Sequence, residues 1–427
     1  MVHSDVSAIA PAHRTLTQWL QYLESIHPTA IDLGLERCQQ VADKLGLDFA
    51  ASTVITVAGT NGKGTTCAFL EQTAIEQGKS VAVYSSPHLL SYRERVRVNG
   101  KPAADAAFCE AFTAVDEARG DISLTYFEFG TLAALVMMYA WQPDVVILEV
   151  GLGGRLDATN IITPNLAVIT TIDLDHQDWL GDTRDKIAVE KAGIMRPGIK
   201  AVIGEREPPA SLLAEVERFQ ADAVWAGQDF NISEHSEGWQ WQLKEHKLTQ
   251  LPYPGIPLQN AATAIAALYQ LGWLQDREAL TRIISRTSLP GRRQQLQEAP
   301  RVVVDVGHNP QATANIRRWL KDYQYDNLYI VAGMLKDKSV AATLAPFEGL
   351  HAQWLLAGTS GPRGLDGESL QAVLPETERQ NSATFAQVVD AYQHARTKCS
   401  QSDMILVFGS FLTVADVLAL HTEKFTD

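Results

Sequence analysis

The chain has 427 residues, enough for about two or three domains with sizeable buried cores. Its 46% hydrophobic and 20% charged residues are ordinary for a globular protein and exclude a mostly disordered or fibrous chain. A formal net charge of −14 argues against a general nucleic-acid or anionic-membrane binder, although a few local cations can still bind small anionic substrates.

Cysteine usage and hydropathy indicate the compartment. The longest apolar run, residues 132–141, is about half as long as a membrane span requires, and residues 1–20 carry no signal-peptide core. The cysteines are scattered and form no C-x-x-C pair: Cys38, Cys67, Cys109 and Cys399. We therefore expect a soluble cytoplasmic protein with reduced thiols, without a zinc site, a disulfide framework or a membrane partner.

The first predicted elements form the start of a parallel α/β unit. A β-branched run over residues 53–57 predicts a strand, and a glycine-rich loop over 58–66 follows it directly. The pattern of 67–77 predicts a helix that ends with Gly78 as its C-cap. Residues 81–84 predict the next strand, so the order is strand, glycine loop, helix, strand.

The alternation of strands and helices continues along the chain. Residues 145–150 and 167–172 are near-continuous apolar runs, as expected for parallel strands buried on both faces. Residues 184–192 predict a helix. Period-two alternation between 231 and 251 predicts a short antiparallel hairpin, and an alanine-rich helix is expected over 258–271.

A break at residues 288–291 precedes a second α/β segment. The elements predicted there are a strand over 302–306, a helix over 311–323, and strands over 328–332, 354–357 and 405–408. We place a domain boundary near Pro290. The sequence thus predicts a P-loop-type parallel-sheet ATPase domain over 1–289 and a smaller Rossmann-like α/β domain over 290–427.

The glycine loop has the features of a phosphate cradle. Its backbone N–H groups and the start of the next helix can face an anion, and Lys63 can neutralise phosphate charge. The strict P-loop pattern fails twice, because Val57 replaces a glycine and Gly64 separates Lys63 from Thr65. The alternative is a glycine-rich turn with a surface lysine, which the flanking strand and helix disfavour.

Polar residues follow three predicted strands. Ser86, Glu149 and His176 each lie near the carboxyl end of a strand, where α/β sheets bind ligands. A hydroxyl, a carboxylate and an imidazole form a mixed oxygen and nitrogen set suited to Mg²⁺ shared with phosphates. For His176 alone, a hydrogen-bonded structural role is the alternative.

Several longer motifs together resemble one family. They are TVAGTNGKGTT at 56–66, YSSPHL at 84–89, LTYFEFG at 124–130, EVGLGGRLDATN at 149–160, DH at 175–176, WLG at 179–181 and EKAGI at 190–194. This combination resembles the bacterial bifunctional dihydrofolate synthase/folylpolyglutamate synthase family, within the wider superfamily of Mur ligases. The likeness extends from residues 31–34 to residues 409–411.

The resemblance implies an ATP-dependent amide ligase. ATP would phosphorylate a carboxylate of 7,8-dihydropteroate or of a reduced folate, and the amine of L-glutamate would attack the acyl phosphate. The implied cofactor is Mg²⁺, with ATP as co-substrate, and we expect a monomer with no nucleic-acid partner. Phosphoryl transfer depends on positioning and charge neutralisation, which agrees with the absence of a nucleophilic serine or cysteine pattern.

The resemblance also implies residue roles. Lys63, Lys191, His176 and Glu149 would carry catalysis, and Lys191 would be carbamylated. Magnesium ligands would be Ser86, Glu149 and His176, and ATP contacts would be Thr60, Asn61, Gly62, Lys63, Asn260, Arg292 and Asp305. The implied folate and pteroate contacts are Asp32, Leu33, Thr125, Tyr126, Phe127, Glu128, Leu156, Asp157 and Ala158.

Structural alternatives exist for several of these residues. Tyr126 and Phe127 are equally consistent with core aromatics, and Asp305 with a cap on the turn at 308–310. Without the resemblance, Lys191 reads as a surface lysine paired with Glu190. One departure from the family is Gly307, where alanine usually precedes His-Asn-Pro; we expect the loop to survive but cannot assign a contact to His308.

Three other functions remain open at this point. The chain could be a folylpolyglutamate synthase without dihydropteroate activity, although residues 125–128 favour bifunctionality. A Mur-type ligase would carry a UDP-sugar-binding domain before the phosphate loop, which begins too early here. A nucleotide-switch ATPase would leave the second α/β domain without a role.

Overall fold

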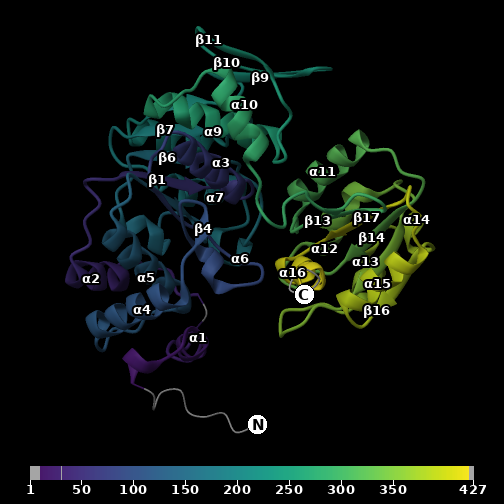
Figure 1. Ribbon diagram of the computed structural model, residues 1–427, viewed down its shortest axis with the longest axis horizontal. Helices are drawn as coiled ribbons and strands as arrows, with labels where there is room; N and C mark the ends of the chain where they lie inside the picture. The colour runs from purple at the N-terminus through teal and green to yellow at the C-terminus, as the bar shows by residue number, and fades with distance from the viewer. Residues whose placement is uncertain (1–9, 30, 423–427) are drawn as a thin grey trace.

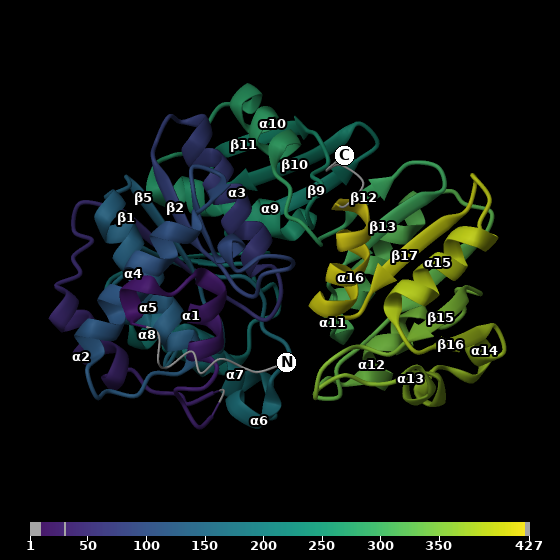
Figure 2. The ribbon, with the colours of Figure 1, turned by 60° about the horizontal axis from the view of Figure 1, so that its bottom comes forward.

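The computed structural model describes residues 10–29 and 31–422. The sequence analysis expects no signal-peptide core in residues 1–20, and residues 1–9 of that segment lie outside the described residues. Two α/β parts stand side by side (Figure 1, Figure 2). The first carries an eight-stranded and a three-stranded sheet, and the second carries a six-stranded sheet. No helix in these ranges is long and apolar enough to cross a membrane.

The eight-stranded sheet has the order β4-β3-β2-β5-β1-β6-β7-β8 and is parallel from β2 to β8. Its strands are β1 (Thr53–Ala58), β2 (Val81–Tyr84), β3 (Val96–Val98), β4 (Lys101–Pro102), β5 (Val145–Glu149), β6 (Leu166–Ile169), β7 (Lys200–Ile203) and β8 (Asp222–Trp225). The central β1 and β5 are buried on both faces, as their apolar sequences predict.

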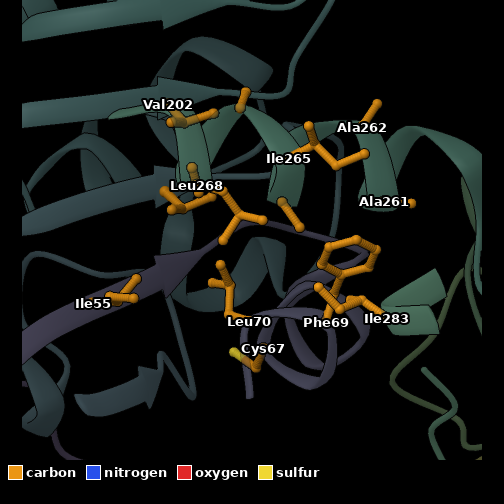
Figure 3. Packing of buried hydrophobic residues seen from close by; sticks show 14 of the residues in the cluster. Ile55, Cys67, Phe69, Leu70, Val202, Ala261, Ala262, Ile265, Leu268 and Ile283 are labelled. Carbon is orange, nitrogen blue, oxygen red and sulfur yellow. The ribbon is translucent and has the colours of Figure 1, made fainter. Parts of the chain in front are cut away.

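Helices cover both faces of this sheet. One face packs against α3 (Lys63–Glu76), α9 (Leu258–Leu271) and α10 (Arg277–Arg286), with Phe69, Leu70 and Ile265 in the shared core (Figure 3). Each such fully buried side chain contributes roughly 1.5–3 kcal/mol. The other face carries α1 (Leu16–Leu23), α2 (Glu36–Leu45), α4 (Asp105–Arg119), α5 (Tyr126–Trp141), α7 (Arg184–Ala192) and α8 (Ala210–Arg218).

Two boundaries differ from the sequence prediction next to the glycine loop. The helix α3 begins at Lys63, four residues before the expected residue 67, with Gly62 as its N-cap. The strand β6 ends at Ile169 rather than at residue 172. The chain after Ile169 leaves the sheet because the carbonyl of Thr171 accepts a hydrogen bond from the amide of Thr60.

The predicted hairpin between 231 and 251 is a three-stranded antiparallel sheet with the order β11-β10-β9. Its strands are β9 (Phe230–His235), β10 (Gly238–Leu243) and β11 (His246–Leu251). Trp239 and Trp241 of β10 are fully buried and pack into the same core as α9. The prediction missed the first strand because most of its side chains are exposed and give no clear alternation.

The second part is built on a six-stranded sheet with the order β12-β13-β17-β14-β15-β16. The strands are β12 (Gln294–Gln297), β13 (Arg301–Asp305), β14 (Leu328–Ala332), β15 (Gln353–Ala357), β16 (Ser382–Phe385) and β17 (Met404–Phe408). One face of this sheet is covered by α11 (Pro310–Trp319), α12 (Val340–Leu344) and α13 (Gly367–Val373), with the short helices η5 (Leu320–Asp322), η6 (Ala345–Phe347) and α14 (Glu376–Arg379) nearby. The opposite face is covered by α15 (Val388–Lys398) and α16 (Phe411–Thr422).

Residues 287–293 connect α10 to β12, and residues 287–291 of this segment link the two parts. In this link Gly291 has φ +70°, and a Cβ there would lie 2.9 Å from Leu89 of the first part. The backbone amide of Val306 donates to the carbonyl of Gly291. We propose that the domain boundary lies in this link, near Pro290.

Candidate active site

The phosphate loop joins β1 to α3 at the carboxyl edge of the first sheet. Gly62 has φ +89°, and a Cβ there would lie 2.6 Å from Oδ1 of Asn260, so this position suits glycine alone. The side chain of Lys63 folds back, and its Nζ donates to the carbonyls of Gly59 (2.8 Å) and Thr60 (3.2 Å). These residues surround the N-terminus of a 14-residue helix, whose dipole favours an anion.

Thr60 and Asn61 are held by the segment that follows β6. Oγ1 of Thr60 donates to the carbonyl of Asp173 at 3.0 Å. The amide of Asn61 donates to Oγ1 of Thr171 at 3.1 Å, and Oγ1 of Thr170 donates to the carbonyl of Asn61 at 2.6 Å. The three hydroxyls therefore fix the shape of the loop, which explains why the strand β6 gives way to this segment early.

Buried charges face one another beneath the loop. Glu149 ends β5 and is only 6% exposed. Burial raises the pKa of Glu149, while the charges of Lys63 and Arg292 and the backbone N–H of Ser86 oppose that rise. Burial lowers the pKa of Lys63, opposed by Glu149 and Asp175. The structure thus brings Lys63, Glu149 and Ser86 together, with Arg292 reaching them from beyond the link.

His176 lies beyond the end of β6 in a left-handed backbone conformation, with φ 50°. Burial lowers its pKa to about 4, so the imidazole is neutral at pH 7 and has a free lone pair. The charge of Asp175 opposes this lowering of the pKa, whereas the charges of Lys338, Lys63 and Lys191 add to it.

The chemistry of these donors fits a magnesium ion. In the described ranges no cluster of three or more His, Cys, Asp or Glu side chains could hold a metal by itself. Glu149 and His176 would therefore need the hydroxyl of Ser86 and phosphate oxygens to complete the shell of a hard cation. A site completed by its nucleotide suits Mg²⁺, which is commonly held by one or two carboxylates and substrate phosphates.

Lys191 is a buried lysine on α7, with 4% of its surface exposed. Burial and the nearby charge of Lys63 together lower its pKa to about 7. The alternative pairing with Glu190 does not form, because the carboxylate of Glu190 pairs with Arg155 at 2.7 Å. A neutral amine is accessible near pH 7, and this is the form that reacts with CO₂.

Asp305 and Arg292 have different environments. Oδ2 of Asp305 accepts from the amide of Arg293 at 3.0 Å and Oδ1 accepts from the amide of Gly307 at 2.8 Å, so the carboxylate shapes the turn after β13. The turn forms with glycine at position 307. The guanidinium of Arg292 lies 4.9 Å from the ring centroid of Phe411, and its charge acts on Asp305 and Glu149.

The sequence analysis missed the residues that join the second part to the phosphate loop. Nδ2 of Asn61 donates to Oδ1 of Asn309 (3.1 Å) and to Oε1 of Gln311 (2.6 Å), and Nδ2 of Asn309 donates back to Oδ1 of Asn61 (2.9 Å). Nζ of Lys338 donates to Asp175 at 2.8 Å. The His-Asn-Pro motif was the available signal for Asn309, whereas no motif distinguished Lys338.

Two predicted folate contacts form an ion-pair chain through Arg37. Nη1 of Arg37 pairs with Asp32 at 2.7 Å, and Nη2 donates to Oε1 of Glu128 at 2.9 Å. Oε2 of Glu128 accepts from the amide of Thr125 at 2.7 Å in a capping box that starts α5. Both oxygens of Glu128 are thus hydrogen-bonded, and Glu128 holds the side chain of Arg37 toward Asp32.

Asp32 and Leu33 line an open cavity of about 760 Å³ together with Arg37 and the exposed Trp179.

The remaining predicted folate contacts lie in α5 or in the segment that follows β5. Phe127 packs directly over Gly151, where a Cβ would clash with its ring. Asp157 is buried, and its oxygens accept from the amide of Leu152 (2.8 Å) and from Thr159. Tyr126 packs edge-on against Tyr92 with centroids 5.9 Å apart. Leu156 precedes the short helix η4 (Ala158–Ile161), and Ala158 is buried in the core beside α5.

Comparisons with known proteins agree with this geometry. Residues 57–268 match the Mur ligase middle domain, and residues 291–411 match the Mur ligase glutamate ligase domain. The chain is 45% identical over 404 residues to the dihydrofolate synthase/folylpolyglutamate synthase of Escherichia coli, covering 94% of each chain. The protein of that name from Haemophilus influenzae is 42% identical, with 95% of this chain and 97% of the relative covered.

Solved structures that resemble this chain belong to proteins of the same kind as these relatives. The E. coli protein FolC in complex with DHPP and ADP superposes with a TM-score of 0.93 at 44% identity, over 97% of this chain and 100% of that chain. A bifunctional folylpolyglutamate synthase/dihydrofolate synthase with Mn, AMPPNP and L-glutamate bound has a TM-score of 0.89 at 44% identity, over 96% and 98% of the two chains. The chain belongs to the dihydrofolate synthase/folylpolyglutamate synthase family of Mur-type ligases.

Proposed function

We propose that this protein uses ATP to ligate L-glutamate to 7,8-dihydropteroate, forming dihydrofolate, and to the γ-carboxylate of reduced folates, forming folylpolyglutamates. The observation that carries the proposal is the closure of the phosphate loop by the second part of the chain. Asn61 of the loop is hydrogen-bonded to Asn309 and Gln311, so a nucleotide bound there lies beside residues of the glutamate ligase domain.

The reaction has two balanced steps. An oxygen of the substrate carboxylate attacks the γ-phosphorus of ATP, the bond from that phosphorus to the β,γ-bridging oxygen breaks, and ADP leaves. The amine of L-glutamate then attacks the acyl carbon of the acyl phosphate. The C–N bond forms, the C–O bond to phosphate breaks, and the amine gives up one proton.

The chain's residues position and neutralise the phosphates. Lys63 and the backbone N–H groups at the start of α3 bind the phosphates of ATP, and Arg292 adds positive charge from across the link. Both cations are half-buried, and partial exclusion of water strengthens their electrostatic effect on phosphate. Asn260, which packs on Gly62, keeps α9 against the loop, and Asp305 holds the turn that presents Arg292.

Ser86, Glu149 and His176 would hold Mg²⁺, with Lys191 as a carbamate beside them. When bound, the metal supplies charge neutralisation for the phosphoryl oxygens. Carbamylation turns the buried amine of Lys191 into an anion with two oxygens, which suits a hard cation better than an ammonium or a neutral amine. It would also remove the repulsion between Lys191 and the nearby Lys63.

The folate or pteroate substrate would lie between the open cavity at Asp32 and the carboxylate of Glu149. Phe127 and Tyr126 offer ring faces along this path, and residues 156–158 close its other side. We also propose a cytoplasmic location, which is supported by the four unpaired cysteines.

The test is ADP release by purified protein with ATP and Mg²⁺, with either dihydropteroate or tetrahydrofolate, in the presence and absence of L-glutamate. We expect ADP release that depends on L-glutamate with both substrates, and an amide product by mass spectrometry. Product with tetrahydrofolate alone would reduce the function to that of a folylpolyglutamate synthase. ADP release that needs neither substrate would favour a simple ATPase.

A further inference from the structure

Three arginines alternate along η3 (Tyr92–Arg95) and β3, and two of them have acidic partners. Arg93 pairs with Asp105 at 3.5 Å, and Arg97 pairs with the buried Glu71 at 2.7 Å. The middle one, Arg95, forms no ion pair with any acidic side chain in the described part of the chain, although it is partly buried.

Neutral groups surround the guanidinium of Arg95. Its Nε donates to Nδ1 of His88 at 3.0 Å, and burial together with the charge of Arg95 lowers the pKa of His88, so this partner carries no charge at pH 7. The guanidinium lies 5.1 Å from the ring centroid of Tyr92 and 5.7 Å from that of Tyr126. Ring faces attract a cation but do not neutralise it.

The neighbouring acid is engaged elsewhere. The carboxylate of Glu94 accepts hydrogen bonds from the amides of Leu89 (2.7 Å), Leu90 (2.9 Å) and Ser91 (2.7 Å), so it caps the turn instead of pairing with Arg95. A partly desolvated cation without a counter-ion is costly unless an anion reaches it. Arg95 is therefore free to receive a carboxylate.

The backbone of Arg95 lies close to residues of the proposed metal site. Its carbonyl accepts from the amide of Ser85, which precedes Ser86, and the amide of Ser86 donates to Glu149. The guanidinium that contacts the rings of Tyr92 and Tyr126 therefore belongs to a residue whose backbone is bonded next to Ser86, beside Glu149, where we propose that the substrate carboxylate reacts.

The two proposed substrates differ at this end. Dihydropteroate has one carboxylate, which must react. A folate has a γ-carboxylate that reacts and an α-carboxylate, two methylenes away, that does not. We infer that Arg95 binds this unreactive α-carboxylate and so determines whether the site accepts folates in addition to dihydropteroate. The inference rests on the proposed function.

The first experiment compares kcat/KM for tetrahydrofolate with kcat/KM for dihydropteroate in Arg95→Met, Arg95→Lys and the matched control Arg93→Met. We expect Arg95→Met to lower the ratio of the two values by at least about tenfold, because an α-carboxylate then stays unpaired. Arg95→Lys should recover part of the ratio, and Arg93→Met should leave it unchanged. An equal loss with both substrates in Arg95→Met, or an unchanged ratio, would overturn the inference.

A second experiment needs no variant and so does not depend on how Arg95→Met folds. Tetrahydropteroyl-γ-aminobutyrate keeps the reacting carboxylate and lacks the α-carboxylate. We expect the wild-type protein to use it at least about tenfold less well than tetrahydrofolate, and the loss in Arg95→Met to be small on this analogue. Equal use of analogue and folate by the wild type would contradict the role of Arg95 while leaving the proposed function intact. A wild type that ligates glutamate to neither natural substrate would contradict the proposed function itself.

Discussion

Buried charged groups have different partners in the two α/β parts. In the second part, Glu378 accepts hydrogen bonds from the amide of Gly349 and from Nε1 of Trp354, and Asp403 accepts from two backbone amides. In the first part, Lys191 is buried and Lys63 is half-buried, and neither forms an ion pair with an acidic side chain in the described ranges. Buried charges are normally satisfied within the protein, so the unsatisfied ones mark where an ionic ligand must bind.

The two parts therefore have different roles at the site. The first part holds the charges that a nucleotide and a metal would neutralise. The second part supplies groups that reach across, such as Arg292, Asn309 and Lys338, and its buried acids Glu378 and Asp403 are hydrogen-bonded within that part.

The largest expected effect on activity follows from removing Lys63. Lys63→Met should lower kcat by about 10²–10³, because one preorganised group that neutralises developing charge is worth this much. Thermal unfolding should occur at a similar temperature, because Lys63 is half-buried and forms two hydrogen bonds to loop carbonyls but no ion pair in the described ranges. The measurements are ADP release and calorimetry. A fall in the unfolding temperature of many degrees would mean that Lys63 stabilises the fold, and it would contradict the proposed difference between the two parts.

Lys191→Ala should lower activity nearly as far, and added acetate or another short carboxylate should restore part of it. The exposed Lys186 of the same helix, which pairs with Asp182, is the matched control as Lys186→Ala. Because the pKa of Lys191 is lowered to about 7, the fraction of the amine that is neutral decreases as the pH drops below 7. We therefore expect a ¹³C-carbamate signal in protein equilibrated with ¹³C-bicarbonate that weakens as the pH drops from 8 to 6. No signal at any pH, with full activity in CO₂-free buffer, would exclude the modification.

Arg292→Ala should have an intermediate effect. The guanidinium stacks on Phe411 and acts on Glu149 from across the link, so its loss should lower kcat/KM for ATP by about tenfold to a hundredfold. The free energy of unfolding should change little, because the group is costly to bury. Steady-state kinetics and urea unfolding test both parts, and wild-type kinetics would remove Arg292 from the site.

Much of the fold was predictable because its central strands are short apolar runs. The helix α7 and the strands β2 and β14 have the predicted bounds. The early end of β6 was not predictable, because the hydroxyls of residues 170 and 171 bond to the phosphate loop, more than 100 positions away. Local patterns carry no information on such pairings.

The candidate site shows the same limit. The sequence placed Ser86 and Glu149 at strand ends and Lys63 in the glycine loop after another strand, and the parallel topology brings these three together. It did not reveal that Asn309 contacts Asn61, 248 positions away, because that contact depends on how two separate sheets are placed. Nor did it show that Glu128 holds Arg37, a role that requires the packing of α5 against α2.

The smallest expected effect on activity belongs to Asp403, a satisfied acid of the second part. Oδ1 accepts from the amide of Asn327 at 2.9 Å and Oδ2 accepts from the amide of Ser400 at 2.6 Å. Asp403→Asn places an NH₂ group against one of these amides, so we expect a loss of about 1–3 kcal/mol in the free energy of unfolding. The kcat should stay within about twofold of the wild type, because no ligand group depends on this turn.

The pH dependence of that loss has a definite sign. Burial alone would raise the pKa of Asp403, but the amides of Ser400 and Asn327 outweigh it and the pKa is lowered. A lowered folded-state pKa gives stability that is present above the unfolded pKa, about 3.9, and is lost as the pH falls through the folded value. The difference in unfolding free energy between wild type and Asp403→Asn, from urea titrations at several pH values, should therefore be constant from pH 5 to 7 and shrink below about pH 4. A difference that does not shrink would mean that the ionised carboxylate is not what the amides stabilise, and a large fall in kcat would show that the second part also holds charges needed for catalysis.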